Sequence, residues 1–372
     1  TGSRAEYGLL QGLIKEIQDS KDLELQLVVA GMHLSPEFGL TYREIEKDGF
    51  EISRTIDMQL TSDTSMGIAK SLGLGTIGFG EALHALKPEI LVLLGDRFEL
   101  LAAASAALVA LIPIAHIHGG ELTHSAIDDS IRHMITKMSD LHFVANISFK
   151  NRVMQLGENP KNIFNIGSLG IDAMKQLKFK SKNQIYDLYK IPKKKKYFII
   201  AIHPETIKKK NEELINNLLE AINEFNEYFF IFTYPNSDTG SNDILNAIKS
   251  FVKKNGSSAL IKSAGRVDYL SLVKYSSALI GNSSSGLVEA PALNVPSINI
   301  GDRQSGRPIA KSVIICKNSR EQVKNSIIKL AKIKKTHNIP YKGRNKVGII
   351  LKILETKELN NIKFKKFYDI NQ

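Results

Sequence analysis

The stretch ILVLLGDRFELLAAASAALVALIPIAHIH, residues 90–118, is the part of the sequence that decides the fold. It begins and ends with short apolar runs, ILVLLG and IPIAHIH, and the Ala-rich segment between them stops at Pro113. Apolar runs of this length are typical of strands that are buried on both faces, and the longer segment between them favours a helix. A strand, a helix and a second strand in this order predict a parallel β–α–β unit.

The same alternation continues through most of the chain. Further strand-like runs are LQLVVAGM and LHFVA in the first half, and YFIIAIHP, YFFIFTYP, SALIGN and PSINIG in the second half. The pattern breaks once, between SLGIDAMKQLKFKSKNQ and the lysine run before Tyr197. We therefore predict an α/β protein with two doubly wound, Rossmann-like domains that face a central cleft. The predicted domains are residues 1–168 and 169–354, with a C-terminal segment, 355–372, that packs back on the first domain.

Composition narrows the classes of protein to consider. Of the 372 residues, 43% are hydrophobic and 24% are charged, as in soluble globular proteins. The one cysteine, Cys316, cannot form an internal disulfide, so nothing indicates an oxidising compartment. No apolar run has the length of a membrane span, and the start, TGSRAEYG, does not resemble a signal peptide. We expect a cytoplasmic protein with no membrane partner. We also expect a few residues to be missing before Thr1, because a glycine turn that leads into a helix normally follows a strand.

The formal net charge of +12 raises the question of a nucleic-acid partner. The lysines lie in separate short runs, at 193–196, 208–210 and 332–335, without interleaved aromatic residues or a nucleic-acid motif. We therefore expect no nucleic-acid partner. A positive field also attracts anionic small molecules, so the charge fits such a substrate without identifying it.

Titratable residues gather where the strand-like runs of the first half end. LGDRFE places Asp96 and Arg97 after one run, and HIHGGELTHSAIDDSIRH, residues 116–133, continues from the next. Because parallel sheets bind ligands at the carboxyl ends of their strands, these residues are candidates for a site. One interpretation is a metal site, since His116 and His118 alternate onto one face of a strand. The other is an acid–base site that acts on a sugar or a phosphate ester.

Hydrogen-bond donors gather at the strand ends of the second half. AIHPET ends one run with His203, and NIGDRQSGRP offers Arg303 after another, with Arg307 as either a ligand or an ordinary surface residue. GNSSSGLVEAP has three serines before a helix that carries Glu289 in its early turns. Hydroxyl groups and N–H groups at a helix start form an anion cradle, whereas helix capping alone explains one serine. The sequence GxxxxGK[ST] of an ATPase loop is missing at this point.

Seven motifs together resemble those of one enzyme family, the hydrolysing UDP-N-acetylglucosamine 2-epimerases of bacterial sialic acid and capsule synthesis. They are GSRAEYG, LGDRFE, HIHGGE, IDDSIRHMITKMSDLHF, HPET, GNSSSGLVEAP and NIGDRQSGR, and the likeness runs from Thr1 to about Val313. The non-hydrolysing epimerases differ, because they begin with GTRPE and carry HVEAGLR where this chain has HIHGGEL. The resemblance implies a fold similar to that of two-domain GT-B glycosyltransferases. It implies release of N-acetylmannosamine and UDP from UDP-N-acetylglucosamine and water through a glycal, with no metal and no cofactor.

The resemblance also implies roles for individual residues. Asp96 and Asp128 match the catalytic carboxylates of the family, and Arg97 accompanies Asp96. Some relatives have a catalytic glutamate where this chain has His118, so either His118 or Glu121 would transfer that proton. The residues expected to bind the UDP moiety are Arg4, His203, Asn236, Ser283, Ser284, Glu289 and Arg303. Asp129, Arg132 and His133 are expected to be supporting residues, since i,i+4 ion pairs from Asp128 and Asp129 would account for them. We further expect a homo-oligomer, either a dimer or a tetramer.

Other functions fit parts of the same pattern. A GT-B glycosyltransferase would use the same nucleotide cradle but leave C2 of the sugar untouched. A metal-dependent hydrolase could be built on His116 and His118, although no later cluster of His and Asp has ligand spacing. A nucleotide-sugar-binding module without activity would not need the acids of the first half. The same reaction on a UDP-2,4-diacetamido-trideoxyhexose also stays open, because hydrolysing relatives act on both kinds of sugar.

Overall fold

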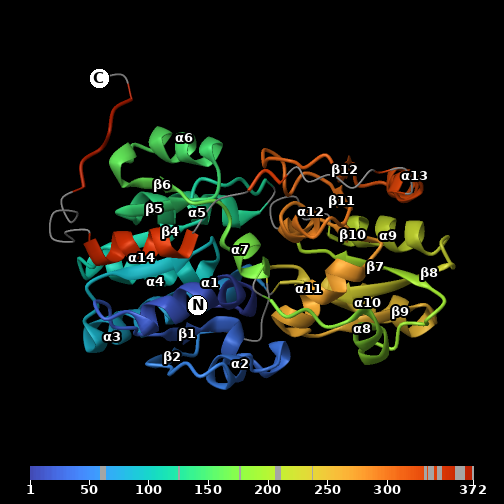
Figure 1. Cartoon of the computed structure of the whole chain (residues 1–372), viewed down its shortest axis with the longest axis horizontal. Helices are drawn as coiled ribbons and strands as arrows, with labels where there is room; N and C mark the ends of the chain where they lie inside the picture. Colours follow the sequence, from blue (N-terminus) through green and yellow to red (C-terminus); the bar gives the residue numbers. More distant parts are fainter. Residues whose placement is uncertain are drawn as a thin grey trace. The chain divides into compact units, whose positions relative to one another are not determined.

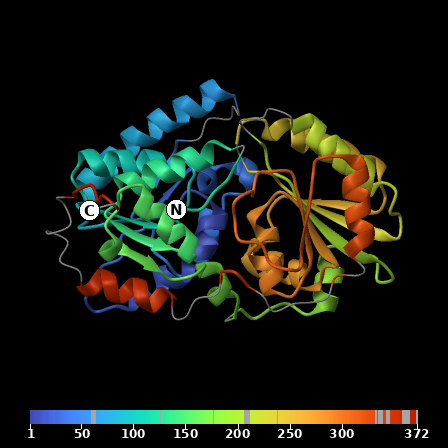
Figure 2. The ribbon, with the colours of Figure 1, turned by 90° about the horizontal axis from the view of Figure 1, so that it is seen from above.

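The computed structural model describes residues 1–58, 64–124, 126–175, 177–205, 211–236, 238–330, 333, 339–341, 346–356 and 365–370. The chain divides into two compact units. Unit 1 comprises Thr1–Glu121, Asp128–Ala173 and Tyr341–Gln372, and unit 2 comprises Leu122–Ile127 and Met174–Pro340. Figures 1 and 2 show that each unit is built from a parallel sheet with helices on both of its faces. The predicted α/β class with two doubly wound parts is confirmed.

The sheet of unit 1 contains the β–α–β unit of residues 90–118. Its strand order is β3 (Leu91–Leu94), β4 (Ile114–Ile117), β5 (Leu141–Val144) and β6 (Ile163–Asn165), and all neighbours are parallel. The helix α4 (Phe98–Val109) connects β3 with β4. Every residue of β4 is buried, as the continuous apolar run predicts. A separate parallel pair is formed by β1 (Val28–Ala30) and β2 (Arg54–Ile56).

Two hydrophobic cores cover the two faces of unit 1. One core joins the sheet to α1 (Arg4–Asp19) and α14 (Lys346–Thr356), and the other joins it to α3 (Ser65–Leu86), α4 and α5 (Ile127–Met138). Other described helices of this unit are α2 (Tyr42–Lys47), α6 (Ile147–Gln155) and the 3-10 turns η1 (Gly31–Leu34), η2 (Pro36–Phe38) and η3 (Pro160–Asn162). The helix α7 (Leu169–Lys175) begins in unit 1 and ends in unit 2. The sheet therefore has an apolar layer on each side, which leaves its strand ends for polar residues.

Unit 2 has a six-stranded parallel sheet. Its order is β12 (Val313–Cys316), β11 (Ser297–Ile300), β10 (Ala278–Gly281), β7 (Lys196–Ala201), β8 (Tyr228–Thr233) and β9 (Ser258–Ile261). One face is covered by α9 (Asn211–Ile222), α10 (Ser241–Lys254) and α13 (Arg320–Leu330). The other face is covered by α8 (Lys182–Leu188), α11 (Gly265–Tyr275) and α12 (Glu289–Ala292). The central strands β7 and β10 end side by side, with Gly281 opposite Ala201.

The C-terminal part of the chain differs from the predicted boundaries. Residues up to 354 were expected in the second domain, but α14 packs on α1, and its Ile350 and Leu354 belong to a core of unit 1. Of the segment 355–372, residues 365–370 and the end of α14 are described. Lys365 Nζ lies 2.9 Å from Glu158 Oε2, and Tyr368 N donates to the carbonyl of Gly157, so this part contacts unit 1. Because the apolar side chains of α14 complete the layer over the sheet of unit 1, this helix belongs to unit 1 and not to the second domain.

Two of the three lysine runs lie outside the described residues. They are 208–210 and 332–335, of which only Ile333 is described. None of the described helices combines the length and the apolar character that a membrane span requires.

Candidate active site

His116 lies inside β4 and has a structural environment. Its side chain is fully buried, and Nε2 lies 2.7 Å from the carbonyl of Gly95 at the end of β3. Because a carbonyl only accepts, Nε2 carries the proton, and Nδ1 accepts from Thr136 Oγ1 at 3.1 Å. Burial lowers the pKa of His116 to about 3, so the ring is neutral. A metal ion could bind His116 only by displacing one of these hydrogen bonds.

His118, two residues further on, has a different environment. It follows β4 directly, with a φ of +67°, which is strained for a residue other than glycine. The turn after it is tight, since Gly120 has a φ of +76° and a Cβ there would lie 2.5 Å from the carbonyl oxygen of Phe149. This turn brings the buried Glu121 back, so that its Oε1 lies 3.6 Å from His118 Nδ1. The two candidates for the middle proton transfer are therefore neighbours.

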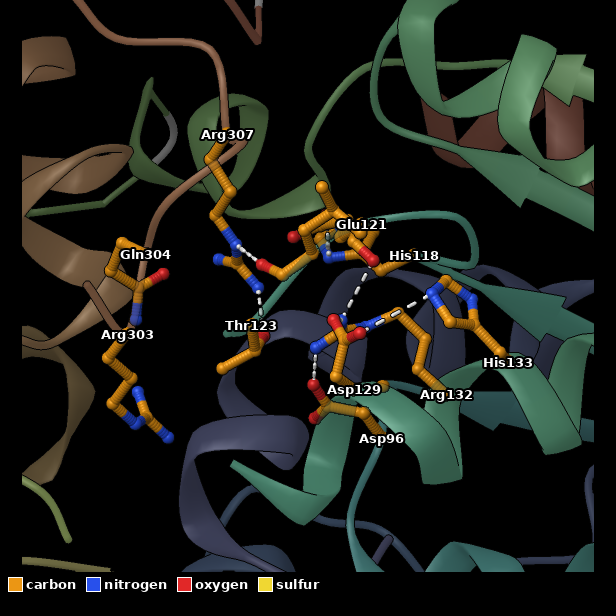
Figure 3. A network of polar contacts seen from close by, with 12 residues as sticks. Asp96, His118, Glu121, Thr123, Asp129, Arg132, His133, Arg303, Gln304 and Arg307 are labelled. Atoms are coloured by element: carbon orange, nitrogen blue, oxygen red, sulfur yellow. Dashed lines mark hydrogen bonds and ion pairs between the residues drawn. The ribbon is translucent and has the colours of Figure 1, made fainter. Parts of the chain in front are cut away.

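Arg132 is the centre of the polar network in unit 1. It lies on α5, is 1% exposed, and forms an ion pair with Asp96 at the end of β3. The same guanidinium donates to Asp129 Oδ1 at 3.4 Å and to the carbonyl of Glu121 at 2.9 Å. Figure 3 shows Arg132 between these groups. The sequence suggested Arg132 only as a supporting residue, because nothing local indicates that it reaches Asp96.

Arg97, Arg4 and Asp128 are the other predicted residues of unit 1. Arg97 forms a buried ion pair with Glu99, with 3.3 Å between Arg97 Nε and Glu99 Oε2. Arg4, in the first turn of α1, pairs with Glu44 at 3.1 Å. Asp128 is buried in the first turn of α5.

The predicted pair between Asp129 and His133 is present, with 3.7 Å between Oδ2 and Nε2. Within the described parts of the chain, no group of three or more His, Cys, Asp or Glu residues is placed to hold a metal ion.

In unit 2, Asn282 joins the ends of β10 and β7. Its side chain is fully buried, accepts from His203 N at 2.8 Å and donates to the carbonyl of His203 at 2.9 Å. His203 Nδ1 in turn accepts from the backbone N–H of Asn236 at 3.1 Å. A neutral ring with this acceptor carries its proton on Nε2, where it can donate to an anionic oxygen. Asn282 was not among the predicted site residues, although it lies inside the GNSSSG motif.

Arg303 and Gln304 meet the same asparagine from the loop after β11. The Arg303 guanidinium lies 3.4 Å from the carbonyl of Asn282, and Gln304 Nε2 donates to that carbonyl at 2.9 Å. Both side chains are buried. Three of the predicted UDP ligands, His203, Asn236 and Arg303, are thus connected through hydrogen bonds with Asn282 or with each other.

The serines do not lead directly into the helix that carries Glu289, as predicted, but into a separate 3-10 turn. Ser283 accepts from Ser285 N and caps the 3-10 turn η4 (Ser284–Gly286). The helix expected to carry Glu289 in its early turns, α12, begins at Glu289 and ends at Ala292. At the start of the loop Gly281 has a φ of +148°, and a Cβ there would lie 2.7 Å from the carbonyl carbon of Ala201. Capping therefore accounts for Ser283, while Ser284 and Ser285 stay partly exposed.

Arg307 is buried, so the alternative of an ordinary surface residue is wrong. Its Nε donates to the carbonyl of Leu122 at 2.6 Å and its NH2 group donates to Thr123 Oγ1 at 3.0 Å (Figure 3). Leu122 directly follows Glu121 in the chain, so Arg307 holds the start of the segment that separates Glu121 from Asp128.

The fold defines the general class. Two doubly wound α/β units are the architecture of GT-B-like proteins, and a solved structure confirms the class: the UDP-N-acetylglucosamine 2-epimerase of Neisseria meningitidis bound to UDP-N-acetylglucosamine. It matches with a TM-score of 0.80 over 95% of this chain and 97% of that chain, at 19% sequence identity.

The sequence defines the family. The family model described as UDP-N-acetylglucosamine 2-epimerase matches residues 15–355, and the chain belongs to this family of epimerases. A GDP/UDP-N,N'-diacetylbacillosamine 2-epimerase (hydrolyzing) from Campylobacter jejuni is 44% identical over 84% of this chain and 82% of the relative. The polysialic acid biosynthesis protein P7 of Escherichia coli is 39% identical over 100% of this chain and 96% of the relative. The resemblance found in the sequence motifs is confirmed at the level of the family.

Proposed function

We propose that the protein hydrolyses UDP-N-acetylglucosamine with inversion at C2 and releases N-acetylmannosamine and UDP. The observation that carries this proposal is the network of Asp96, Arg132, His118 and Glu121 at the strand ends of unit 1. It gathers groups that can exchange protons beside a buried cation, Arg132, that pairs with Asp96. The product would serve sialic acid or capsule synthesis in the cytoplasm, in line with the polysialic acid protein among the relatives.

The reaction needs such a network because the proton on C2 is not acidic. Departure of UDP would give C1 oxocarbenium character, and a base would then remove the C2 proton to leave a glycal. Water would add at C1 and a proton would return to C2 on the opposite face. Asp96 and Asp128 are proposed for proton transfer and stabilisation of the cation, with Arg97 beside Asp96. Either His118 or Glu121, which lie 3.6 Å apart, would carry out the remaining proton transfer.

The leaving UDP needs donors to its developing charge. We assign this role to His203, Asn236, Ser283, Ser284 and Arg303 in unit 2 and to Arg4 in unit 1, with Glu289 as the partner of the ribose hydroxyls. The support is the frame around Asn282, which orients His203 and contacts Arg303. In this scheme neither a metal ion nor a cofactor takes part, and activity should survive EDTA. A loss of activity that zinc restores would return the metal-site alternative.

A second candidate substrate is a UDP-2,4-diacetamido-trideoxyhexose. The relative with 44% identity carries the name of a diacetylbacillosamine 2-epimerase, and this name favours the second candidate. The polysialic acid biosynthesis protein with 39% identity favours UDP-N-acetylglucosamine instead. The chemistry at C1 and C2 is the same for both sugars. The two differ at C4 and C6.

The test is turnover of both nucleotide sugars in D2O. The released sugar should have the inverted configuration at C2 and carry deuterium there, because the stripped proton is replaced from solvent. The C1–O bond to UDP should be the bond that breaks. A glycosyltransferase or a simple glycosidase never touches C2, so an undeuterated sugar with the original configuration would overturn the proposal. The ratio of kcat/KM for the two sugars, measured by mass spectrometry and NMR of the products, selects the substrate.

A further inference from the structure

The turn of residues 118–121 carries both candidates for the remaining proton transfer, His118 and Glu121. Its backbone is left-handed at two positions, with a φ of +67° at His118 and +76° at Gly120. A residue other than glycine keeps this conformation only where contacts with its surroundings hold it there. Strained residues of this kind gather at active sites, where the strain helps to fix functional side chains. The contacts that hold the turn therefore bear on the reaction proposed above.

Three elements of unit 1 hold the first half of the turn. The N–H group of His118 donates to the carbonyl of Phe143 in β5 at 2.8 Å. A Cβ at Gly119 would lie 2.9 Å from Thr136 Oγ1 on α5 and 3.1 Å from His116 Nδ1 on β4, closer than side chains normally pack. Because only glycine allows this approach, the backbone at Gly119 lies directly against α5 and β4.

Two arginines hold the carbonyl groups of the second half of the turn. Arg152, from α6, donates through one guanidinium nitrogen to the carbonyl of Gly120 at 2.5 Å. Arg132, from α5, donates to the carbonyl of the next residue, Glu121, at 2.9 Å. Hydrogen bonds from a charged donor are stronger than those between neutral groups. Two consecutive peptide groups are thus oriented by two guanidinium groups that come from different helices.

Arg152 is itself restrained on α6. It is half-buried, and its guanidinium carbon lies 5.9 Å from the centre of the Phe149 ring, three residues earlier on the helix. The side chain of Phe149 is fully buried, and a Cβ at Gly120 would lie 2.5 Å from the Phe149 carbonyl oxygen. The helix α6 therefore determines the position of Gly120 twice, by direct packing of its main chain and by the hydrogen bond from Arg152.

From these contacts we infer that Arg152 is a positioning residue for the reaction under "Proposed function", and the inference rests on that function. Arg152 holds the turn in the conformation that keeps His118 Nδ1 and Glu121 Oε1 3.6 Å apart. Without the hydrogen bond to Gly120, the strained backbone at His118 relaxes, and the two side chains lose this spacing. A displacement of about 1 Å at a reacting group lowers turnover by about 10²-fold. In this role Arg152 acts through Gly120 and not by contact with the sugar.

Lys137 provides a matched control. It lies in the last turn of α5, and its Nζ donates to the carbonyl of Leu156, directly after α6, at 3.0 Å. Like Arg152, it is a cation that joins a main-chain carbonyl to a neighbouring helix. It also contacts Glu158 and Phe367, which lie outside residues 118–121 as Leu156 does. Lys137→Ala thus removes a cation with a similar contact at a different place in unit 1.

Steady-state kinetics of Arg152→Ala, with the nucleotide sugar that the native chain turns over, test the role. We expect kcat to fall by about 10²-fold, because the reacting side chains lose their spacing. The KM of the sugar and the Kd of UDP should stay within about two-fold, since the residues assigned to UDP are not part of this turn. Lys137→Ala should keep native kcat. If Arg152→Ala kept native kcat as well, the inference would be wrong.

Chemical rescue separates positioning from a general loss of stability. Millimolar guanidinium should raise the kcat of Arg152→Ala several-fold, because the free ion can donate to the Gly120 carbonyl in place of the missing side chain. It should not raise the kcat of the native chain or of Lys137→Ala. Arg152→Lys keeps the charge and one donor, so its kcat should lie between those of Arg152→Ala and the native chain. Lowered turnover that neither guanidinium nor lysine restores would indicate a structural role and overturn the inference.

Hydrogen exchange tests the positioning of the turn without relying on the reaction. The backbone amides of residues 118–122 should exchange at least about five-fold faster in Arg152→Ala than in the native chain, and at the native rate in Lys137→Ala. If the native chain turned over neither nucleotide sugar while these rates differed as expected, the proposed function would be wrong and the positioning of the turn would stand. Native exchange rates in Arg152→Ala would overturn the inference even where turnover falls.

Discussion

The strand ends of the two units use buried polar groups in opposite ways. In unit 1, Asp96 lies against the cation of Arg132, and Glu121 lies 3.6 Å from a histidine. In unit 2, the corresponding place after the strand is taken by Asn282, a neutral amide that bonds to the main chain of His203 on both sides. Carboxylates and imidazoles can gain or lose protons, whereas an amide cannot. The first region is therefore suited to proton transfer, and the second is suited to holding fixed donors in place.

The largest effect is expected from Asp96→Asn, which removes a proton-transfer group from unit 1. Turnover should fall by about 10³-fold, while the Kd of UDP stays within a few-fold, and Asp128→Asn should behave alike. UDP release under saturating substrate and calorimetry with UDP measure the two quantities.

Asp129→Asn is the matched control, because Asp129 contacts the same guanidinium. If it lowered turnover as much as Asp96→Asn does, the effect would come from the ion pair with Arg132 and not from the chemistry.

In unit 2 the comparison predicts a loss of stability. Asn282→Ala leaves the N–H and the carbonyl of His203 without their amide partner, which should lower the free energy of unfolding by about 2 to 4 kcal/mol. Urea unfolding measures this change. Asn223 is exposed, and its Oδ1 accepts a hydrogen bond from Asn255 Nδ2 at 3.3 Å, so Asn223→Ala should cost less than about 0.5 kcal/mol. Equal effects of the two substitutions would contradict the role of Asn282 in stabilising the main chain at His203.

Arg303→Ala should weaken the binding of UDP by roughly 1.5 to 3 kcal/mol, because it removes a donor to a charged ligand. Ser284→Ala should act in the same direction. The comparison variant is Arg307→Ala, since Arg307 is also buried but holds the backbone after Glu121. It should change turnover more than UDP affinity. If calorimetry found native UDP affinity in both Arg303→Ala and Ser284→Ala, the assignment of these two residues to the nucleotide site would be wrong.

The smallest effect, counted per pH unit, concerns the histidines of unit 1. Burial lowers the pKa of both His116 and His33 to about 3 from 6.5, so the unfolded chain binds more protons than the folded chain between these values. Their contribution to stability is therefore complete above pH 6.5 and is lost as the pH falls toward 3. His116→Asn should reduce the slope of unfolding free energy against pH by up to about 1.4 kcal/mol per pH unit. Urea unfolding from pH 7 to pH 4 measures the slope, and an unchanged slope would contradict the buried, neutral state of His116.

Much of the architecture could be predicted from residues 90–118 and the runs like them. A strand covered on both faces needs a continuous apolar run, and this local signal survives without knowledge of the fold. The sequence also predicted that polar residues gather at the strand ends, because the carboxyl ends of parallel strands lie at one edge of the sheet. The motifs at these ends were specific enough to identify the family, which the family match to residues 15–355 confirms.

Partners far apart in the chain were decided only by the tertiary structure. Arg132 meets Asp96 from 36 positions away, and Arg307 reaches Leu122 across most of unit 2. His116 and His118 look equivalent by strand alternation, yet one is locked between Gly95 and Thr136 while the other begins a strained turn. Periodicity indicates which apolar residues face the core, because the hydrophobicity of each side chain and its place in the repeat are local properties. Which buried charges become neighbours depends on register, turn geometry and the packing of helices on the sheet, and these exist only in the folded chain.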